Sequence, residues 1–310
     1  MPGVVYERAA VLGCGLIGSS LLRAMRARGV ARTLAAADPS EAVRARLQAL
    51  ALADAVSADP LEAAGDADLV ILAAPSMAIV EDAPAVAAAM KPGATLTDVG
   101  SVKGAVADAF AALPPSLHAV PGHPIAGTER SGPDAGFAEL FDGRWTILTP
   151  LERPGDDAYA LAVARLSAFW RALGSTVELM DARHHDLVLA VTSHLPHLIA
   201  YNIVGTAADL EQVQRAEVMK FSAGGFRDFT RIAASDPVMW RDVFLLNREA
   251  VLEVLGRFTE DLQALSRAIR WGEGDKLHDL FSRTREIRRG IVAAGQESPE
   301  PNFGRDRGKA

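Results

Sequence analysis

Cysteine is almost absent from this chain of 310 residues, in which Cys14 is the single example. One cysteine excludes an internal disulfide framework and a cysteine-rich metal site. No uninterrupted apolar run reaches the roughly 18 residues that predict a membrane span. The opening MPGVVYERAAVLG lacks a basic segment followed by an apolar one, so no secretory signal is predicted. These absences favour a cytoplasmic protein that does not enter a membrane.

An excess of basic residues is also lacking, because the formal net charge is −7. This charge argues against a general nucleic-acid binder. An anionic ligand would therefore need a local cluster of arginine or lysine to hold it. The chain is 49% hydrophobic and 23% charged, which is enough apolar material for a sizeable core. Its length suits about two domains.

A glycine-rich turn near the N-terminus is the most informative motif. The apolar run 9–12 leads into Gly13, Gly15 and Gly18, and apolar residues at helical spacing follow. This is the GxGxxG pattern of a dinucleotide site, in its required context of strand, turn and helix. Gly13 permits the tight turn, Gly15 lets a pyrophosphate approach, and Gly18 lets the helix pack on the strand. The helix N-terminus, with Leu16 and Ile17, would offer N–H groups to the phosphates.

An acidic residue, Asp38, ends the next apolar run about 20 residues after Gly18, where this class of site carries an acid. A carboxylate there accepts hydrogen bonds from the adenosine ribose hydroxyls and repels a 2′-phosphate. The pattern therefore predicts NAD rather than NADP. The alternative is that Asp38 only caps a helix that begins near Pro39 and Ser40.

Strand and helix patterns alternate through the first half of the chain. We expect strands at 9–12, 33–37, 69–73, 95–98, 118–121, 144–148 and 176–179, and helices at 19–28, 40–50, 76–90, 103–112 and 156–173. This alternation predicts an α/β fold, a Rossmann-type doubly wound and mainly parallel sheet. Ligands of such sheets bind beyond the carboxyl ends of the strands. The residues of interest at those ends are Gly13, Asp38, Ala74, Pro75, Ser101 and His123.

The pattern becomes helical after about residue 181. Helix-period segments run over 182–207, 209–221, 236–270 and 272–294, and Pro196 should kink the first of them. We therefore expect a nucleotide-binding domain at 1–181 and an all-helical domain at 182–295. The segment 296–310, rich in proline, glycine and charge, is expected to be a disordered tail.

His123 is the strongest candidate for acid–base chemistry. It directly follows a predicted strand and precedes Pro124, which favours an extended backbone. A neutral imidazole at this edge could take a proton from a hydroxyl while a nicotinamide takes a hydride. The alternative is a loop histidine bonded to backbone. Ser101, near Lys103, could donate to the nicotinamide, the substrate or His123, or it could instead cap the helix that follows.

Two further segments carry polar residues at helical spacing. Ser193 and His197 lie on one helix face, where hydrogen bonding to a substrate is a better interpretation than metal ligation, since His194 and His197 lack a nearby carboxylate. A structural role for His194 is equally open. Arg231 and Arg227 are also one turn apart, and a guanidinium holds a carboxylate in a bidentate manner. The alternative for both is a solvated helix face.

Five segments, in order, carry a resemblance that spans residues 6–294: GCGLIGSS, DVGSVKG, GHPIAGTERSG, SHLPH and GGFRDFTRIAASDPVMW. Together they resemble the prephenate/arogenate dehydrogenase family, which makes tyrosine precursors by oxidative decarboxylation. The resemblance implies a nucleotide domain, a helical dimerisation domain and an active site between them. It implies NAD as cofactor, a homodimer, and no metal.

The resemblance also assigns roles to individual residues. His123 resembles the histidine that accepts the proton of the ring C4 hydroxyl, and Ser101 the serine that shares this hydroxyl and orients the nicotinamide. Arg231 resembles the arginine that holds the substrate carboxylate. The pocket or its gate is matched by Ser193, His197, Thr128, Glu129, Gly224 and Trp240.

The sequence leaves some alternatives open. Prephenate and arogenate differ only in a keto or an amino group, and no motif separates them. A second enzyme class, the β-hydroxyacid dehydrogenases, would need a lysine of the helical domain, for which Lys220 and Lys276 are the candidates. A non-catalytic NAD-binding regulator would keep the glycines and Asp38 but would not need His123, Ser101 and Arg231 together.

Overall fold

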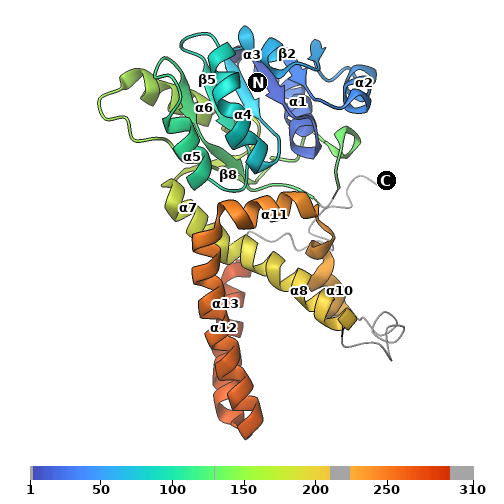
Figure 1. Ribbon diagram of the computed structural model, residues 1–310, viewed down its shortest axis with the longest axis vertical. Helices are drawn as coiled ribbons and strands as arrows, with labels where there is room; N and C mark the ends of the chain where they lie inside the picture. The colour runs from blue at the N-terminus through green and yellow to red at the C-terminus, as the bar shows by residue number, and fades with distance from the viewer. Residues whose placement is uncertain (1–2, 129, 210–223, 294–310) are drawn as a thin grey trace. The chain divides into compact units, whose positions relative to one another are not determined.

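The computed structural model describes residues 3–128, 130–209 and 224–293. The chain divides into two compact units, Met1–Leu252 and Glu253–Ala310. The first unit contains two sheets with their covering helices and the first helices of the second half of the chain (Figure 1). The second unit is a pair of long helices, and it is described by itself below.

A six-stranded parallel sheet forms the centre of the first unit, with strand order β3-β2-β1-β4-β5-β6. Its strands are β1 (Tyr6–Leu12), β2 (Ala31–Ala37), β3 (Ala55–Ser57), β4 (Leu69–Leu72), β5 (Thr95–Asp98) and β6 (His118–Val120). The order reverses direction beside β1, which is the position where ligands bind in doubly wound sheets. The predicted α/β class, with a doubly wound and mainly parallel sheet, is therefore confirmed.

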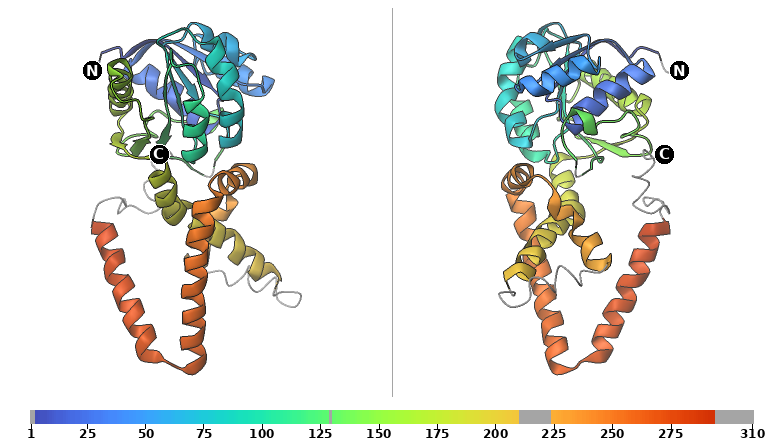
Figure 2. Two further views of the ribbon diagram at one scale, coloured as in Figure 1. Left: turned by 60° about the vertical axis from the view of Figure 1, so that its left-hand side comes forward. Right: turned by 90° about the vertical axis from the view of Figure 1, so that its right-hand side faces the viewer.

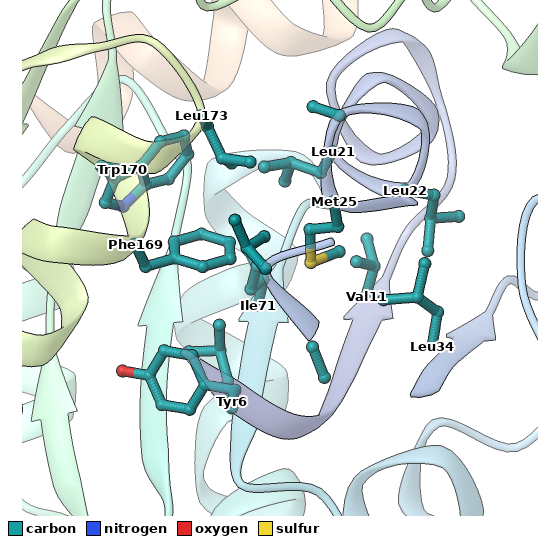
Figure 3. Close-up of a cluster of buried hydrophobic side chains, with 14 of the residues drawn as sticks. Tyr6, Val11, Leu21, Leu22, Met25, Leu34, Ile71, Phe169, Trp170 and Leu173 are labelled. Carbon is teal, nitrogen blue, oxygen red and sulfur yellow. The ribbon is translucent and has the colours of Figure 1, made fainter. Parts of the chain in front are cut away.

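Helices cover both faces of this sheet, because successive side chains of a strand point to opposite faces. Ala9 and Val11 of β1 pack in the core with α1 (Leu16–Arg28), α2 (Glu41–Ala49) and α6 (Asp157–Ala172). Ala10 and Leu12 pack in the core of the other face with α3 (Pro60–Gly65), α4 (Ser76–Ala89) and α5 (Gly104–Ala111). Figure 3 shows the first core, where Met25 and Leu21 of α1 approach Phe169 and Trp170 of α6.

A second, three-stranded sheet follows, in the order β7-β8-β9. Its strands are β7 (Gly122–Pro124), β8 (Trp145–Leu148) and β9 (Thr176–Leu179), and β7 pairs antiparallel with β8. The strands predicted at 144–148 and 176–179 are present as β8 and β9, and they lie in this second sheet rather than in the six-stranded one. The three-residue strands β3 and β7 and the six-residue helix α3 were missed, because such short elements show too few periods of a pattern.

The helices after residue 181 begin with α7 (Ala182–Leu189), η2 (Ala190–His194) and α8 (Leu195–Asp209). The turn η2 is π-helical and ends just before Pro196. Proline cannot donate to the preceding turn, so the wider turn accommodates the predicted kink without ending the helix. Further along are α10 (Gly224–Thr230), η3 (Arg231–Ala234) and α11 (Pro237–Leu246). α7 packs against α5, and α11 against α4, within the first unit.

The helix predicted at 236–270 is interrupted. α11 ends at Leu246, Asn247 has a non-helical backbone, and α12 (Arg248–Trp271) begins directly after it. The second unit consists of most of α12 and of α13 (Gly274–Ala293), which diverge from a turn at Gly272 (Figure 2). The helix predicted at 209–221 and the tail predicted at 296–310 lie almost wholly outside the described residues.

One helical stretch of the described residues, Ala182–Asp209, is long and apolar enough to cross a membrane by length and composition alone. Its mean hydropathy is 1.4, and 28% of the window is buried inside the structure. The sequence contains no uninterrupted apolar run of this length, so the stretch was not foreseen as a candidate. A core helix of a soluble protein passes the same test.

Candidate active site

The glycine turn between β1 and α1 is shaped to admit a phosphate. Gly13 has a φ of +93°, and a Cβ there would lie 2.7 Å from the Ala73 carbonyl oxygen. A Cβ on Gly18 would collide with the Gly13 carbonyl oxygen, whereas Gly15 faces open space. The first N–H groups of α1 have no acceptor within the helix. Leu16 and Ile17 are the first two residues of α1, so their N–H groups are among these donors.

Asp38 stands at the carboxyl end of β2 and joins this strand to the glycine turn. One carboxylate oxygen accepts the Cys14 N–H at 2.9 Å, and the other accepts the Ser40 N–H at 2.9 Å. The N-cap of α2 is Ser40, whose hydroxyl accepts from Val43. The alternative role of Asp38 as the cap of this helix was therefore wrong. Its half-buried carboxylate retains lone pairs for a further donor.

A buried ion pair ties the loop after β5 to β7. Lys103 and Asp98 are both fully buried, and they bond directly. The ammonium also donates to the Gly122 carbonyl at 2.8 Å, and Asp98 accepts the N–H groups of Gly122 and Gly100. Burial lowers the pKa of Lys103, against the opposing effect of Asp98. This pair holds the loop that carries Ser101 beside the strand that carries His123.

His123 lies on β7, opposite Ile147 of β8, and only 8% of it is exposed. Its Nδ1 lies 2.9 Å from Nε2 of His185 on α7. Burial is the main cause that holds the pKa of His123 well below its usual value, and the neighbouring His185, Lys103 and His194 act in the same direction. At neutral pH this imidazole is therefore uncharged, with a lone pair to accept a proton.

Asp186 continues this contact series from His185. Its Oδ1 lies 2.9 Å from Nδ1 of His185. The same carboxylate accepts the N–H of Lys103 and of Gly104, each at 2.7 Å. These are the free donors at the start of α5, so Asp186 caps this helix from α7. The alternative role of Ser101 as the cap was wrong; Ser101 lies two residues before the cap position Lys103 and is partly exposed.

A second cluster of rings surrounds Trp240 on α11. The His197 ring stacks on Trp240 with centroids 3.6 Å apart, and His194 meets it edge-on at 6.0 Å. His197 donates from Nδ1 to the Ser193 carbonyl at 2.8 Å, which leaves its Nε2 as an acceptor. Burial lowers the pKa of His194 to about 4, so it is neutral near pH 7.

Arg231 opens the short helix η3 and is half-buried. It lies close enough to His197 that its positive charge lowers the pKa of that imidazole, after the larger effect of burial. The elements η2, α8, η3 and α11 thus bring together four predicted residues: Ser193, His197, Arg231 and Trp240. Arg227 is exposed on α10, one turn away.

Asn247 connects the two clusters. Its amide donates to the Asp186 carbonyl at 2.8 Å and lies 3.0 Å from His194 Nδ1. His123 and His194 also interact electrostatically, which places the two rings near one another. The break between α11 and α12 at Asn247 is therefore the point that joins the His123 series to the Trp240 cluster.

The remaining predicted residues are less closely tied to these clusters. Ala74 is half-buried and Pro75 is exposed, at the start of α4 beside the glycine turn. Thr128 is half-buried, and its hydroxyl accepts the Arg130 N–H at 3.2 Å. Gly224 is exposed at the start of α10. Glu129 lies outside the described residues.

Four residues of the site were not predicted from the sequence: His185, Asp186, Asn247 and the buried end of Lys103. One signal was available, since Asp186 is a carboxylate near the start of the apolar helical stretch Ala182–Asp209. No cluster of three or more metal-ligating side chains occurs in the ranges that the structure describes. His194 and His197 bond instead to Asn247 and to the Ser193 carbonyl.

Two family models together match most of this chain. A model of the nucleotide-binding domain of prephenate dehydrogenase matches residues 21–179, and a model of its dimerization domain matches residues 181–283. Cyclohexadienyl dehydrogenase of Zymomonas mobilis is 44% identical over 286 residues, which cover 92% of this chain and 96% of that protein.

Two solved structures are also similar over nearly the whole chain. Prephenate dehydrogenase from Aquifex aeolicus, in complex with hydroxyphenyl propionate and NAD+, superposes with a TM-score of 0.82 at 31% identity, covering 92% of this chain and 98% of that one. Arogenate dehydrogenase from Synechocystis gives a TM-score of 0.74 at 26% identity, covering 92% and 99%. The resemblance expected from the five motifs is confirmed, and this chain belongs to the prephenate dehydrogenase family of oxidoreductases, with a nucleotide-binding domain followed by a helical dimerization domain.

Proposed function

We propose that this enzyme oxidises prephenate with NAD and releases CO2, using His123 as the proton acceptor. The observation that carries the proposal is the position of His123. It is a buried and neutral imidazole on β7, beside the loop of Ser101 and near the cluster of His197, Trp240 and Arg231. A pKa held below neutrality keeps the base unprotonated when the substrate binds.

The glycine turn and Asp38 suit NAD. The open space at Gly15 leaves room for a pyrophosphate over the start of α1. Asp38, anchored by two backbone N–H groups, would accept from the ribose hydroxyls and repel a 2′-phosphate. Leu16, Ile17, Ala74 and Pro75 border the same space. The bound nicotinamide would supply the hydride acceptor, and Ser101 would orient it.

The substrate carries two carboxylates, so a cationic partner is needed in a protein of net charge −7. Arg231 would clamp one carboxylate. His197, with its free Nε2, and Ser193 would bond to polar groups of the side chain. Trp240 would form a wall of the pocket, and we propose Thr128, Glu129 and Gly224 for its rim.

The protein mainly has to orient the substrate against the nicotinamide and to accept one proton. His123 takes the proton of the ring C4 hydroxyl as the C4 hydride leaves, which turns C4 into a ketone. The bond from the ring to its carboxylate then breaks, and its electrons make the ring aromatic as a phenolate. The protonated His123 returns its proton to that oxygen, so atoms and charges balance without a metal.

We further propose a homodimer. Large apolar side chains of α12 and α13 are exposed, and they include Trp271 at 72%, Ile269 at 67% and Phe281 at 57% exposure. Residues 181–283 match a dimerization domain, which includes most of these helices. Burying these side chains against a second chain would remove the exposed apolar surface. The boundary of the nucleotide domain is proposed at residue 181, between the end of its family model at residue 179 and the start of α7 at Ala182. We place the enzyme in the cytoplasm.

The decisive experiment is initial-rate kinetics with prephenate and arogenate, each with NAD and NADP. We expect NADH formation and CO2 release with prephenate and NAD, and a panel of β-hydroxyacids should be inert. Turnover of a hydroxyacid but of neither cyclohexadiene would overturn the proposal. The lysine that such a reaction needs is not supplied by Lys276, which is 70% exposed and paired with Glu273, and Lys220 lies outside the described residues.

A further inference from the structure

His185 and Asp186 carry no role in the reaction as proposed, yet they are the direct neighbours of its base. All three side chains are buried: His123 is 8% exposed, His185 0% and Asp186 7%. The two contacts that join them are each 2.9 Å long, which is a normal hydrogen-bond length. Each of these contacts needs one donor and one acceptor, so the position of the proton on one group determines the position of the proton on the next.

Asp186 determines which nitrogen of His185 carries the proton. Its Oδ1 accepts the Lys103 N–H and its Oδ2 accepts the Gly104 N–H, so the carboxylate acts as an acceptor on both sides. An acceptor oxygen facing Nδ1 of His185 requires a proton on that nitrogen. Burial lowers the pKa of His185, so the ring is neutral and its Nε2 carries a lone pair.

The lone pair of His185 Nε2 faces Nδ1 of His123. His123 must then carry its proton on Nδ1 and donate it to His185. A neutral imidazole has only one ring proton, so Nε2 of His123 is left as the free base. Asp186, which caps α5, therefore determines which nitrogen of His123 accepts a proton, and it does so through the ring of His185.

We propose that His185 and Asp186 are positioning residues for His123: they fix its Nε2 as the proton acceptor and stabilise the charge that it gains. The inference rests on the proposed role of His123. When Nε2 takes the substrate proton, the positive charge on His123 is shared through His185 with the Asp186 carboxylate. The arrangement is a carboxylate–histidine pair extended by a second imidazole, in which the carboxylate orients and the ring nearest the substrate reacts.

Other charged groups also face these rings and set the pH response. Lys103, from the loop before α5, and His194, from η2, lower the pKa of His123. Asp98, at the end of β5, and Asp186 raise the pKa of His185. The two rings are coupled, so their titration belongs to the pair. Replacing Asp186 by asparagine removes the nearest negative charge, which makes protonation of the pair harder.

Two variants of His185 make a matched test. His185→Gln places an amide oxygen near the former Nε2 and can still accept from His123, whereas His185→Asn is too short to reach it. We expect His185→Asn to lower kcat by about 10²–10³-fold and His185→Gln by about tenfold or less. The dissociation constant of NAD should stay within about twofold of the wild-type value in both variants, because His185 lies on α7 and not at the glycine turn.

Asp186→Asn tests the start of the series. Its amide can donate to His185 Nδ1, which forces the proton of His185 onto Nε2 and that of His123 onto its Nε2. We expect kcat to fall by about 10²–10³-fold and the acid limb of its pH profile to move to lower pH. A helix cap with no catalytic role would change the melting temperature but leave that limb in place.

A measurement on the unmodified enzyme keeps the inference testable if a variant does not fold. ¹⁵N NMR of the histidine-labelled protein at neutral pH distinguishes protonated from free ring nitrogens, with His123→Asn used to assign the signals. The inference requires a protonated Nδ1 and a free Nε2 on His123. A protonated Nε2 would overturn it, as would a His185→Asn enzyme with wild-type kcat or equal losses in the Gln and Asn variants. Full activity of His123→Asn would instead overturn the proposed function itself.

Discussion

The cofactor side and the substrate side of this site consist of different kinds of chemical groups. The turn that would hold the dinucleotide consists of glycines, backbone N–H groups and one carboxylate, all within residues 13–38. The substrate side consists of buried and half-buried side chains from β7, α7, η2, α8, η3 and α11, among them four histidines with a lowered pKa. The first is fixed by local backbone shape, and the second by contacts between distant segments.

This difference separates the groups that would bind the cofactor from the groups that would carry out the reaction. Backbone N–H groups do not titrate, so their ability to bind phosphate does not change with pH. Burial keeps these histidines neutral, so their protonation depends on the pH and on the charged groups around them. Substitutions on the two sides should therefore change different quantities: cofactor affinity on one side, and turnover and pH response on the other.

The largest effect is expected on the substrate side, at His123. His123→Asn should lower kcat by about 10²–10⁴-fold, because it removes the group that accepts the proton. The affinity for NAD, measured by fluorescence titration, should be unchanged. A variant that keeps its turnover would show that the buried imidazole is not the base, and the contrast between the two sides would disappear.

The cofactor side is tested by two alanine substitutions that differ only in the space available. Gly18→Ala would drive a methyl group into the Gly13 carbonyl, whereas Gly15→Ala points into open space. We expect Gly18→Ala to lower the melting temperature and abolish NAD binding. Gly15→Ala should fold normally and raise the dissociation constant of NAD by about tenfold, because its methyl group occupies the phosphate approach. Equal melting temperatures would argue against the packing described for Gly18.

Arg231 sharpens the assignment of the substrate clamp. Arg231→Ala should raise the KM for prephenate by about 10–100-fold with a smaller change in kcat, because a carboxylate clamp holds ground state and transition state alike. Arg227→Ala is the matched control, since Arg227 is exposed one turn away on α10. An unchanged KM in Arg231→Ala, or an equal rise in both variants, would remove Arg231 from the pocket.

The smallest expected effect concerns stability against pH. Burial lowers the pKa of His123, His185, His194 and His197, so the unfolded chain binds more protons than the folded one below about pH 6.5. The free energy of unfolding should therefore fall as the pH falls from 7.5 to 5.5, as urea titrations would measure. His194→Gln should reduce that slope, and substitution of the exposed His278 should not. A slope of the opposite sign would contradict the burial of these rings.

Local patterns predicted most of the first half of the fold. The glycine turn, the strands that lead to it and Asp38 could be placed because their residues are neighbours in the chain, and spacing alone carries the signal. The family resemblance likewise rested on five contiguous motifs. These features needed no knowledge of which distant segments meet.

Long-range partners could not be predicted in the same way. The cap of α5 comes from Asp186, more than 80 residues further along the chain, and nothing near Ser101 indicates it. β7 became a separate antiparallel strand because it pairs with β8 rather than with β6. The break at Asn247 was hidden inside a continuous helical pattern, because the amide is held by Asp186 and His194.

The most direct test of the account is a crystal structure of this enzyme with NAD and a 4-hydroxyphenyl carboxylate that mimics the product. The account predicts that the phenolic oxygen lies about 2.6–3.2 Å from Nε2 of His123, and that Arg231 bonds the carboxylate. A complex in which Nδ1 of His123 faces the phenol, or in which Arg231 and His123 contact separate molecules, would contradict it.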